Sequence, residues 1–189
     1  MAPLIAIGVL WLVWILFWIA MASWAAPAEK RTTAGEAALY RLATTIGAIV
    51  LAVGDLVDGG PLWRLGALGQ WALFAAAVLG LAFTVWARLY LGRLWSSSVT
   101  RKADHHVVDT GPYAFVRHPI YTGLIAALCA TALLKASPLG FVGVALMTWG
   151  FWLKARLEER FLSEQLGVEA YGAYRRKVPM LIPFGPRSP

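Results

Sequence analysis

The sequence predicts an all-α integral membrane protein with about five transmembrane helices, in which the fourth and fifth form a helical hairpin and a C-terminal amphipathic segment follows. Three observations predict this fold class. Of the 189 residues, 59% are hydrophobic and only 14% are charged, whereas soluble domains carry roughly 25% charged residues. Several apolar runs are long enough to cross a hydrocarbon core, which takes roughly 20 helical residues. Lys and Arg mostly flank these runs. We expect a single membrane domain over residues 1–189.

The N-terminal part, residues 1–95, contains three predicted spans, at residues 4–26, 36–57 and 62–91. In the first span Trp11, Trp14 and Trp18 recur at three- and four-residue spacing, which places them on one helix face. Packing or anchoring at the membrane interface is the expected role of such a stripe. The turn residues Asp58-Gly59-Gly60-Pro61 separate the second span from the third.

The second part, residues 96–189, is expected to hold a cofactor-binding loop, a helical hairpin and a cytoplasmic tail. The loop, residues 96–119, is too rich in Gly, Pro, Asp and His to be a span. A short fourth span at residues 120–134 and a fifth that starts near residue 139 form the hairpin. The tail, residues 161–189, alternates apolar and basic residues, which is typical of an amphipathic helix at the interface and also compatible with a lid over a site.

The distribution of charge predicts the orientation in the membrane. Lys and Arg concentrate at residues 88–117, at residues 154–177 and at Lys30-Arg31. Under the positive-inside rule this places the N-terminus outside and the polar loop and tail in the cytoplasm. The net charge is +7, and we expect the basic residues to contact anionic lipid headgroups. A nucleic-acid-binding protein would need a basic face on a soluble fold.

The cysteine and histidine content excludes two kinds of site. Cys129, the one cysteine, has no disulfide partner and lies in an apolar run, so we expect a buried, inert thiol. Three histidines with one remote cysteine are too few for a structural zinc site. The sequence therefore predicts no metal.

The most polar stretch, residues 105–123, is where the sequence places its chemistry. Gly111-Pro112 predicts a turn, and Pro119 fits the first turn of the fourth span. Arg117 and His118 would then stand at the positive end of that helix, which favours an anionic group such as a carboxylate. The alternative is that they only anchor to headgroups, but ionisable groups held beside membrane helices are more often functional.

A second group of charges lies on the cytoplasmic end of the fifth span. Arg156 and Glu159 share a helix face at i, i+3 spacing, so an intrahelical ion pair is the simple interpretation. Glu158 points about 100° away and is positioned to reach inward. Two acids here would bind an ammonium group or orient a substrate.

The residues at this end of the chain resemble a known family of membrane enzymes. They are His105, Gly111-Pro112-Tyr113, Val116-Arg117-His118-Pro119, Tyr121, Gly123, Glu158-Glu159, Leu162, Gly167, Tyr171, Tyr174, Val178 and Ile182-Pro183-Phe184. In this order they resemble the isoprenylcysteine carboxyl methyltransferase family, from Arg101 onward. The N-terminal part shows little specific resemblance.

The resemblance implies an integral membrane methyltransferase that takes its methyl group from S-adenosylmethionine. It implies a cofactor pocket formed by the polar loop, the hairpin and the tail, with Glu159 at the cofactor's amino group and Glu158 as the alternative. By matching positions, the residues expected around the cofactor are His105, Val108, Gly111, Pro112, Tyr113, Arg117, His118, Pro119, Tyr121 and Glu159.

For catalysis, methyl transfer to a nucleophile needs chiefly alignment and exclusion of water. We therefore expect Arg156 to hold a carboxylate acceptor and Glu158 to assist it. The family suggests a prenylated cysteine carboxylate as acceptor, a lipophilic substrate that arrives from the bilayer. A small thiol and a phospholipid amine remain alternatives, as do a membrane NAD(P)H-dependent reductase and a membrane protein without catalytic activity.

Overall fold

The computed structural model describes residues 2–22, 30–31, 33–92, 100–101 and 107–187. His105 and His106 lie outside these residues. The helices and strands, in chain order, are α1 (Ala2–Ala22), β1 (Lys30–Arg31), α2 (Ala34–Val53), the 3₁₀ turn η1 (Gly54–Leu56), α3 (Ala67–Leu91), β2 (Thr100–Arg101), the 3₁₀ turn η3 (Gly111–Ala114), α4 (Pro119–Lys135), α5 (Pro138–Leu166) and α6 (Val168–Lys177).

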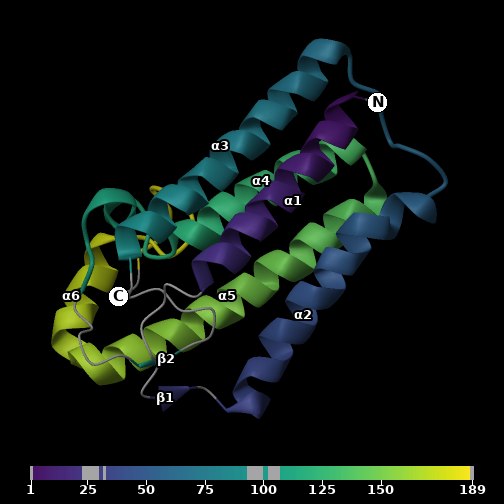
Figure 1. Ribbon diagram of the computed structural model, residues 1–189. Coiled ribbons are helices and arrows are strands. Elements are labelled where there is room, and N and C mark those ends of the chain that lie inside the picture. The colour runs from purple at the N-terminus through teal and green to yellow at the C-terminus, as the bar shows by residue number, and fades with distance from the viewer. Residues whose placement is uncertain (1, 23–29, 32, 93–99, 102–106, 188–189) are drawn as a thin grey trace.

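The long helices form two packed groups, as Figure 1 shows. Helix α2 lies along α5, and α3 lies along α4 with α1 beside them. Contacts between α4 and α5 join the two groups. The short helix α6 turns back at the far end of α5, near the start of α4. The two-residue strands β1 and β2 pair antiparallel, with Lys30 opposite Arg101.

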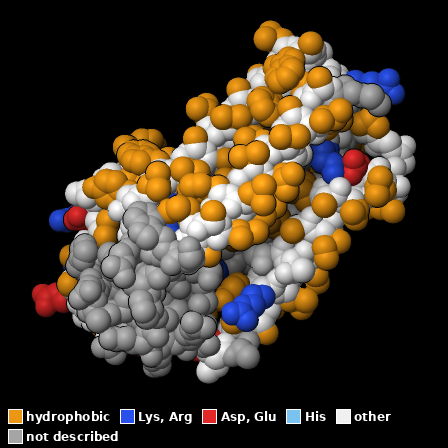
Figure 2. All heavy atoms as spheres, viewed as in Figure 1, with side chains coloured by type: hydrophobic (Ala, Val, Ile, Leu, Met, Phe, Trp, Pro, Cys, Tyr) orange, Lys and Arg blue, Asp and Glu red, His pale blue; other side chains and the backbone are white. Residues whose placement is uncertain are grey.

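The prediction of an all-α membrane fold is confirmed. Within the described residues four helices, α1, α2, α3 and α5, are long and apolar enough to cross a membrane. Helix α4 has 17 residues and is the short fourth helix that the sequence predicted. Hydrophobic side chains cover much of the face drawn in Figure 2, and the charged side chains visible there lie toward the two ends of the molecule.

Glycine pairs set the two closest helix crossings. A Cβ added at Gly123 would lie 2.4 Å from the carbonyl oxygen of Gly80, and one added at Gly143 would lie 2.6 Å from that of Gly47. Both distances are impossible for a real side chain. Small residues of this kind let membrane helices approach closely enough for backbone packing to stabilise them. They explain why α3 packs on α4 and α2 on α5.

The tryptophan stripe of α1 attaches this helix to its neighbours. Trp11 Nε1 donates to Thr131 Oγ1 on α4 at 3.0 Å, and Trp14 Nε1 donates to Thr84 Oγ1 on α3 at 2.7 Å. Trp18 stacks on Trp14. The expected packing role is therefore confirmed, with a polar component that the spacing alone did not predict.

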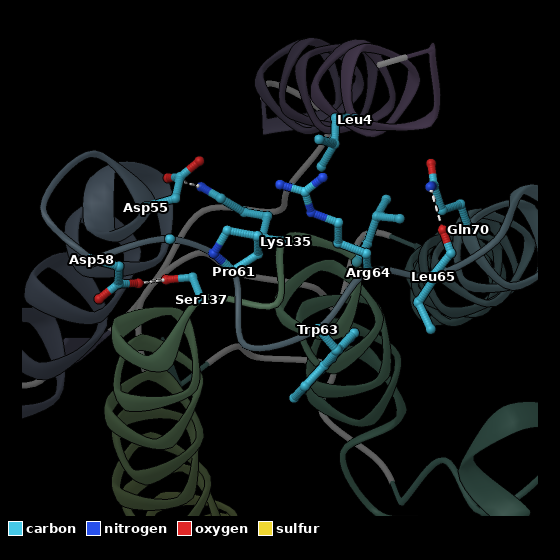
Figure 3. Close-up of a pocket in the computed structure, with 12 residues that line it drawn as sticks. Leu4, Asp55, Asp58, Pro61, Trp63, Arg64, Leu65, Gln70, Lys135 and Ser137 are labelled. Carbon is cyan, nitrogen blue, oxygen red and sulfur yellow. Dashed lines mark hydrogen bonds and ion pairs between the residues drawn. The ribbon is translucent and has the colours of Figure 1, made fainter.

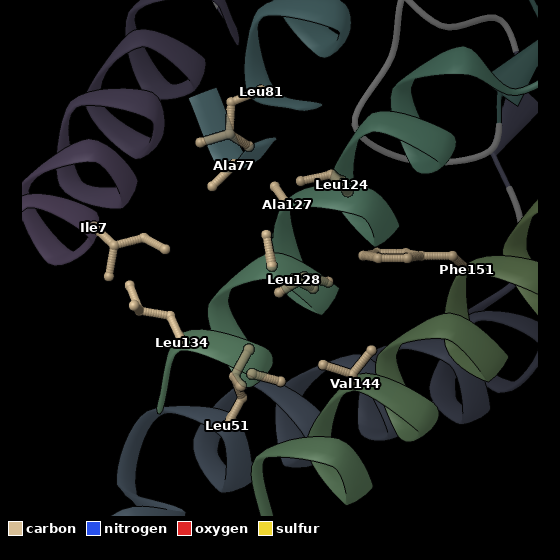
Figure 4. Packing of buried hydrophobic residues seen from close by; sticks show 12 residues of the cluster. Ile7, Leu51, Ala77, Leu81, Leu124, Ala127, Leu128, Leu134, Val144 and Phe151 are labelled. Carbon is tan, nitrogen blue, oxygen red and sulfur yellow. The ribbon is translucent and has the colours of Figure 1, made fainter. Parts of the chain in front are cut away.

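The main hydrophobic core lies between the two helix groups (Figure 4). Leu124 and Leu128 of α4 contribute to it from one group, and Val144 and Phe151 of α5 from the other. Cys129, also on α4, is exposed, so the expectation of a buried thiol is wrong. Its neighbour Leu128 takes the inward position, which turns Cys129 about 100° toward the apolar exterior.

The third span begins later than predicted, at Ala67 instead of residue 62. The intervening residues form a loop that is attached to the α4–α5 connection. The backbone N–H of Leu62 donates to the carbonyl of Ala136 at 2.8 Å, and Trp63 Nε1 donates to the carbonyl of Leu133 at 3.2 Å. These tertiary contacts hold the loop in an extended path, and hydropathy gives no signal for them.

Candidate functional site

The polar loop reaches the start of α4 through a tight turn. Gly111 adopts a positive φ of 56°, a conformation that glycine takes at little cost, and a Cβ there would lie 2.6 Å from the ring of Tyr90. Tyr90 and Thr110 share a hydrogen bond of 2.6 Å beside it. Pro112 follows in the first turn of η3 and is buried. The predicted turn is confirmed, and packing against α3 fixes its position.

Helix α4 starts as predicted, with Pro119 in its first turn and His118 at the N-cap. The backbone N–H groups just before it are satisfied by the tail. Arg117 N–H donates to the carbonyl of Pro179 at 2.9 Å, and His118 N–H donates to that of Met180 at 3.1 Å. Thr122 Oγ1 donates to the carbonyl of Leu181 at 2.6 Å. The chain after α6 is therefore bound to the start of α4.

Arg117 and Glu159 form a buried ion pair between the polar loop and α5. Arg117 Nε lies 2.7 Å from Glu159 Oε1, and their side chains are 1% and 7% exposed. The Nη1 atom of Arg117 also donates to the carbonyls of Arg175, at 2.9 Å, and Val178. A guanidinium has enough donors to satisfy all these partners together. Arg117 thus connects α5 and the tail to the start of α4.

His118 lies between the two glutamates. Its Nε2 is 3.2 Å from Glu159 Oε1, and its Nδ1 is 3.4 Å from Glu158 Oε2. Burial alone would lower the pKa of His118, but the interactions with Glu158 and Glu159 outweigh it and raise the pKa above its usual value. Because carboxylates only accept hydrogen bonds, an imidazolium with both nitrogens protonated suits this position best.

Tyr121 and Lys154 extend the cluster toward the apolar interior. Tyr121 OH donates to Glu158 Oε1 at 2.7 Å, and its ring stacks between those of His118 and Phe151. Lys154 Nζ lies 3.9 Å from Glu158 Oε1. The same ammonium lies 5.6 Å from the ring centre of Tyr121 and 5.8 Å from that of Tyr40 on α2.

Helix α6 covers the cluster from the tail side. Tyr171 and Tyr174 are buried, and Tyr174 OH donates to the carbonyl of Tyr113 at 2.7 Å. Burial raises the pKa of both tail tyrosines well above the usual range, so they act as neutral groups. Arg175 Nε lies 3.4 Å from Glu159 Oε2, yet this buried N–H is not aligned for a hydrogen bond with any described acceptor.

The structure brings together five of the residues that the sequence proposed: Arg117, His118, Tyr121, Glu158 and Glu159. Gly111, Pro112 and Tyr113 support them from the turn below α3, and Pro119 starts α4. Val108 is partly buried in the same loop, and His105 falls outside the described residues.

Arg156 does not join the cluster. Its side chain is exposed, and its guanidinium lies 4.8 Å from the ring centre of Trp152. The ion pairs of Glu159 go to Arg117, His118 and Arg175 instead. The expected i, i+3 pair is therefore replaced by tertiary pairs, because α5 turns Glu159 inward and Arg156 outward.

Sequence reasoning missed two cations of the cluster, Lys154 and Arg175. The i, i+4 spacing of Lys154 and Glu158 was a usable signal, since such residues share a helix face. Arg175 sits in a basic run with Arg176 and Lys177, where the sequence does not indicate which side chain faces inward.

The arrangement as a whole offers alternating charges at the junction of apolar helices and a polar tail. Glu159 is enclosed by cations, whereas the Glu158 side chain is 22% exposed. Among the described residues no group of three or more His, Cys, Asp and Glu side chains is placed to hold a metal ion. The cluster is suited to hold a ligand that carries both charges.

Comparisons with known proteins find relatives over part of this chain. A protein-S-isoprenylcysteine O-methyltransferase of Saccharomyces cerevisiae is 38% identical over 85 residues, which cover 44% of this chain and 35% of the yeast protein. Methanethiol S-methyltransferase 1 of Bradyrhizobium diazoefficiens is 43% identical over 72 residues, which cover 38% of this chain and 24% of that protein. The matched stretches are thus well under two thirds of these relatives.

A solved structure shares the fold. The eukaryotic intramembrane Ras methyltransferase, an isoprenylcysteine carboxyl methyltransferase, aligns with a TM-score of 0.57 over 77% of this chain and 52% of that chain, at 23% identity. The profile of the isoprenylcysteine carboxyl methyltransferase family matches residues 72–164, a range that contains Arg117, His118 and both glutamates. This segment of the chain is therefore similar to the isoprenylcysteine carboxyl methyltransferase family.

Proposed function

We propose that the protein is a membrane-embedded methyltransferase that transfers a methyl group from S-adenosylmethionine to the carboxylate of a lipophilic, isoprenylcysteine-like acceptor. The observation that carries this proposal is the buried charge cluster of Arg117, His118, Glu158 and Glu159 at the start of α4 and toward the end of α5. It lies inside the segment that matches the family, at the boundary between polar tail and apolar helices.

The residues of the cluster fit an amino-acid-bearing cofactor. Such a group needs a cation for its carboxylate and an anion for its ammonium. Arg175 offers a buried N–H without an aligned acceptor among the described residues, and Glu158 offers a carboxylate that remains partly exposed. Glu159, the residue that the sequence favoured for the ammonium, is enclosed by Arg117 and His118. We therefore assign Glu158 to the cofactor's ammonium group. Glu159 has a structural role, in which it holds Arg117 and His118 in place.

Lys154 is our candidate for the acceptor carboxylate, in place of Arg156. Its ammonium lies on the interior side of Glu158, between the rings of Tyr40 and Tyr121. A carboxylate acceptor is already ionised at neutral pH, so no general base has to remove a proton. The bound cofactor supplies an electrophilic methyl group, and the chain's own residues align the acceptor and exclude water.

The same cluster also leaves a thiol acceptor as a second candidate function. The bacterial relative that matches 72 residues is named a methanethiol S-methyltransferase. A thiol must lose its proton to become a nucleophile, and the carboxylate of Glu158, which interacts with His118, is placed to accept it. A small thiol needs no apolar channel, so acceptor size distinguishes the two candidates.

The test is methyl transfer by the purified full chain. Labelled S-adenosylmethionine is incubated with a farnesylated cysteine carboxylate, a short alkyl thiol and a phospholipid amine in parallel. We expect label in the prenylated carboxylate. Label in the thiol alone would show that the protein methylates a thiol, which is the second candidate function. Thermal stabilisation by NADPH but not by S-adenosylhomocysteine would overturn methyl transfer altogether, since a ligand stabilises the folded state it binds.

A matched pair of variants tests the acceptor site. Lys154→Met and Arg156→Met each remove one cation from α5, two residues apart. We expect Lys154→Met to raise KM for the carboxylate acceptor at least about tenfold, which is the effect of losing one charge-assisted contact, with stabilisation by S-adenosylhomocysteine retained. Arg156→Met should behave like wild type. The reverse pattern would indicate that Arg156, and not Lys154, binds the acceptor carboxylate.

A further inference from the structure

A cavity of about 430 Å³ lies at the opposite end of the molecule from the charge cluster. It is lined by the start of α1, the turn after α2, the loop before α3 and the α4–α5 connection, as Figure 3 shows. Its Lys135 ends α4, whereas Pro119 begins that helix at the charge cluster. Seventeen helical residues separate the two places, or about 25 Å at 1.5 Å per residue. The volume lies in the usual range for ligand pockets, roughly 300–1,000 Å³.

The acidic groups of this cavity already have partners. Asp55 Oδ1 lies 2.7 Å from Lys135 Nζ, and the same ammonium donates to the carbonyls of Leu51 and Ala52 at the end of α2. Asp58 accepts hydrogen bonds from Ser137 Oγ and from the backbone N–H of Leu139 at the start of α5. These contacts hold the helix ends together, and both acidic side chains that line the cavity are engaged in them.

Arg64 is the charged group of the cavity that remains without such a partner. Among the residues that the structure describes, none forms an ion pair or hydrogen bond with its guanidinium. Figure 3 shows the side chain extending toward Lys135, beneath Leu4 of α1. Its backbone is held by its neighbours, because Trp63 donates to the carbonyl of Leu133 and packs against the ring of Phe141. Two cations therefore face one cavity, and one of them is unmatched.

We propose that this cavity binds the phosphate group of a membrane phospholipid, with Arg64 as its principal ligand. A guanidinium binds phosphate through paired charge-assisted hydrogen bonds, and Lys135 adds a second positive charge at the edge. The source is a lipid because strongly exposed apolar residues, Leu56, Val57, Leu62 and Leu68, flank in sequence the segments that line the cavity. Acyl chains can follow the apolar helix faces while the headgroup enters the cavity.

The test compares wild type with Arg64→Gln, using the full chain purified in a neutral detergent. The probes are a phosphatidylglycerol, a diacylglycerol with the same acyl chains and inorganic phosphate, and binding is read by native mass spectrometry and by the shift in Tm. We expect wild type to bind the phospholipid and Arg64→Gln to bind it about tenfold more weakly. The side chain of Arg64 is exposed, so its replacement removes no buried packing, and unchanged stabilisation by S-adenosylhomocysteine confirms the fold of this variant.

Arg176→Gln is the matched control, because it removes one exposed arginine from α6 at the other end of the molecule. It should leave phospholipid binding unchanged. Equal binding by wild type and Arg64→Gln, or equal binding of diacylglycerol and phospholipid, would overturn the phosphate site. A further contrary result is that inorganic phosphate binds through Arg64 while the phospholipid does not bind. That result would overturn the proposal that the phosphate group belongs to a lipid.

Discussion

Arg117 connects the segments that form the candidate site. Its guanidinium contacts Glu159 on α5 and the carbonyls of Arg175 and Val178 after the start of the tail. Three segments that are distant in sequence therefore depend on one buried side chain. A buried ion pair of this kind adds little when complete, but the loss of one member leaves an uncompensated charge.

Arg117→Ala should destabilise the protein by about 3–5 kcal/mol, the usual cost of removing one partner of a buried pair. Glu159 would lose its closest cation, and two tail carbonyls would lose their donor. Thermal unfolding in detergent measures the effect. Adding Glu159→Gln to this variant should recover part of the lost stability, because it removes the unpaired charge. If the double variant were less stable by the sum of both single effects, the two residues would not be coupled.

His118 should make stability depend on pH. Its pKa is raised in the folded protein by the two glutamates, which outweigh burial. A raised folded-state pKa means that the stabilisation is complete below the ordinary value near 6.5 and is lost as the pH rises through the folded-state pKa. The difference in Tm between wild type and His118→Gln should therefore be largest in mildly acidic buffer and shrink as the pH rises. A difference that grows with pH would contradict this account.

The types of site residue were predictable from the sequence, but their partners were not. Arg117, His118 and Glu159 stand in a recognisable order, and the turn at Gly111 and the start of α4 at Pro119 follow from local conformational preferences. The inward direction of Lys154 instead of Arg156 depends on how α5 is rotated against α2 and α4. That rotation is set by packing, and the apolar pattern on α5 is too uniform to reveal it.

At the level of helices, the number and order of the elements were predictable because hydropathy and turn residues determine them. The boundaries were less predictable, since the loop at residues 62–66 stays outside α3 through contacts with Leu133 and Ala136. The tail was expected either at the interface or as a lid. Its buried Tyr171 and Tyr174 place α6 on the cluster, which favours the lid.

The crossing of α2 and α5 should tolerate no side chain at its glycines. A Cβ at Gly143 would lie 2.6 Å from the carbonyl oxygen of Gly47 and 2.7 Å from the backbone nitrogen of Leu51. Gly143→Ala should therefore force the helices apart and cost about 1–3 kcal/mol, as overpacking does. Gly8→Ala on α1 is the control, because no atom lies within 4 Å of its added Cβ. The Tm of the first variant should fall and that of the second should not; equal Tm values would remove the close crossing as a source of stability.

For the whole molecule, the charge cluster and the proposed phosphate cavity lie at opposite ends of the long helices. The charge cluster lies at the start of α4 and the far end of α5, whereas the proposed phosphate cavity lies where α4 ends and α5 begins. Helices α1 to α5 run alternately between these two ends (Figure 1). The basic residues concentrate at the end that holds the charge cluster, so under the positive-inside rule we expect that end to face the cytoplasm and the cavity to face outside.

Cysteine labelling tests this orientation. In a Cys129→Ala background, Gly59→Cys introduces a thiol in the exposed turn before α3, and Ala170→Cys introduces one on the exposed side of α6. A membrane-impermeant maleimide added to intact cells should label Gly59→Cys and not Ala170→Cys, and permeabilisation should make Ala170→Cys reactive. The opposite pattern would invert the protein and place the methyl-transfer site outside the cytoplasm. Labelling of both thiols from one side would contradict an odd number of crossings, because Gly59 and Ala170 are separated by α3, α4 and α5.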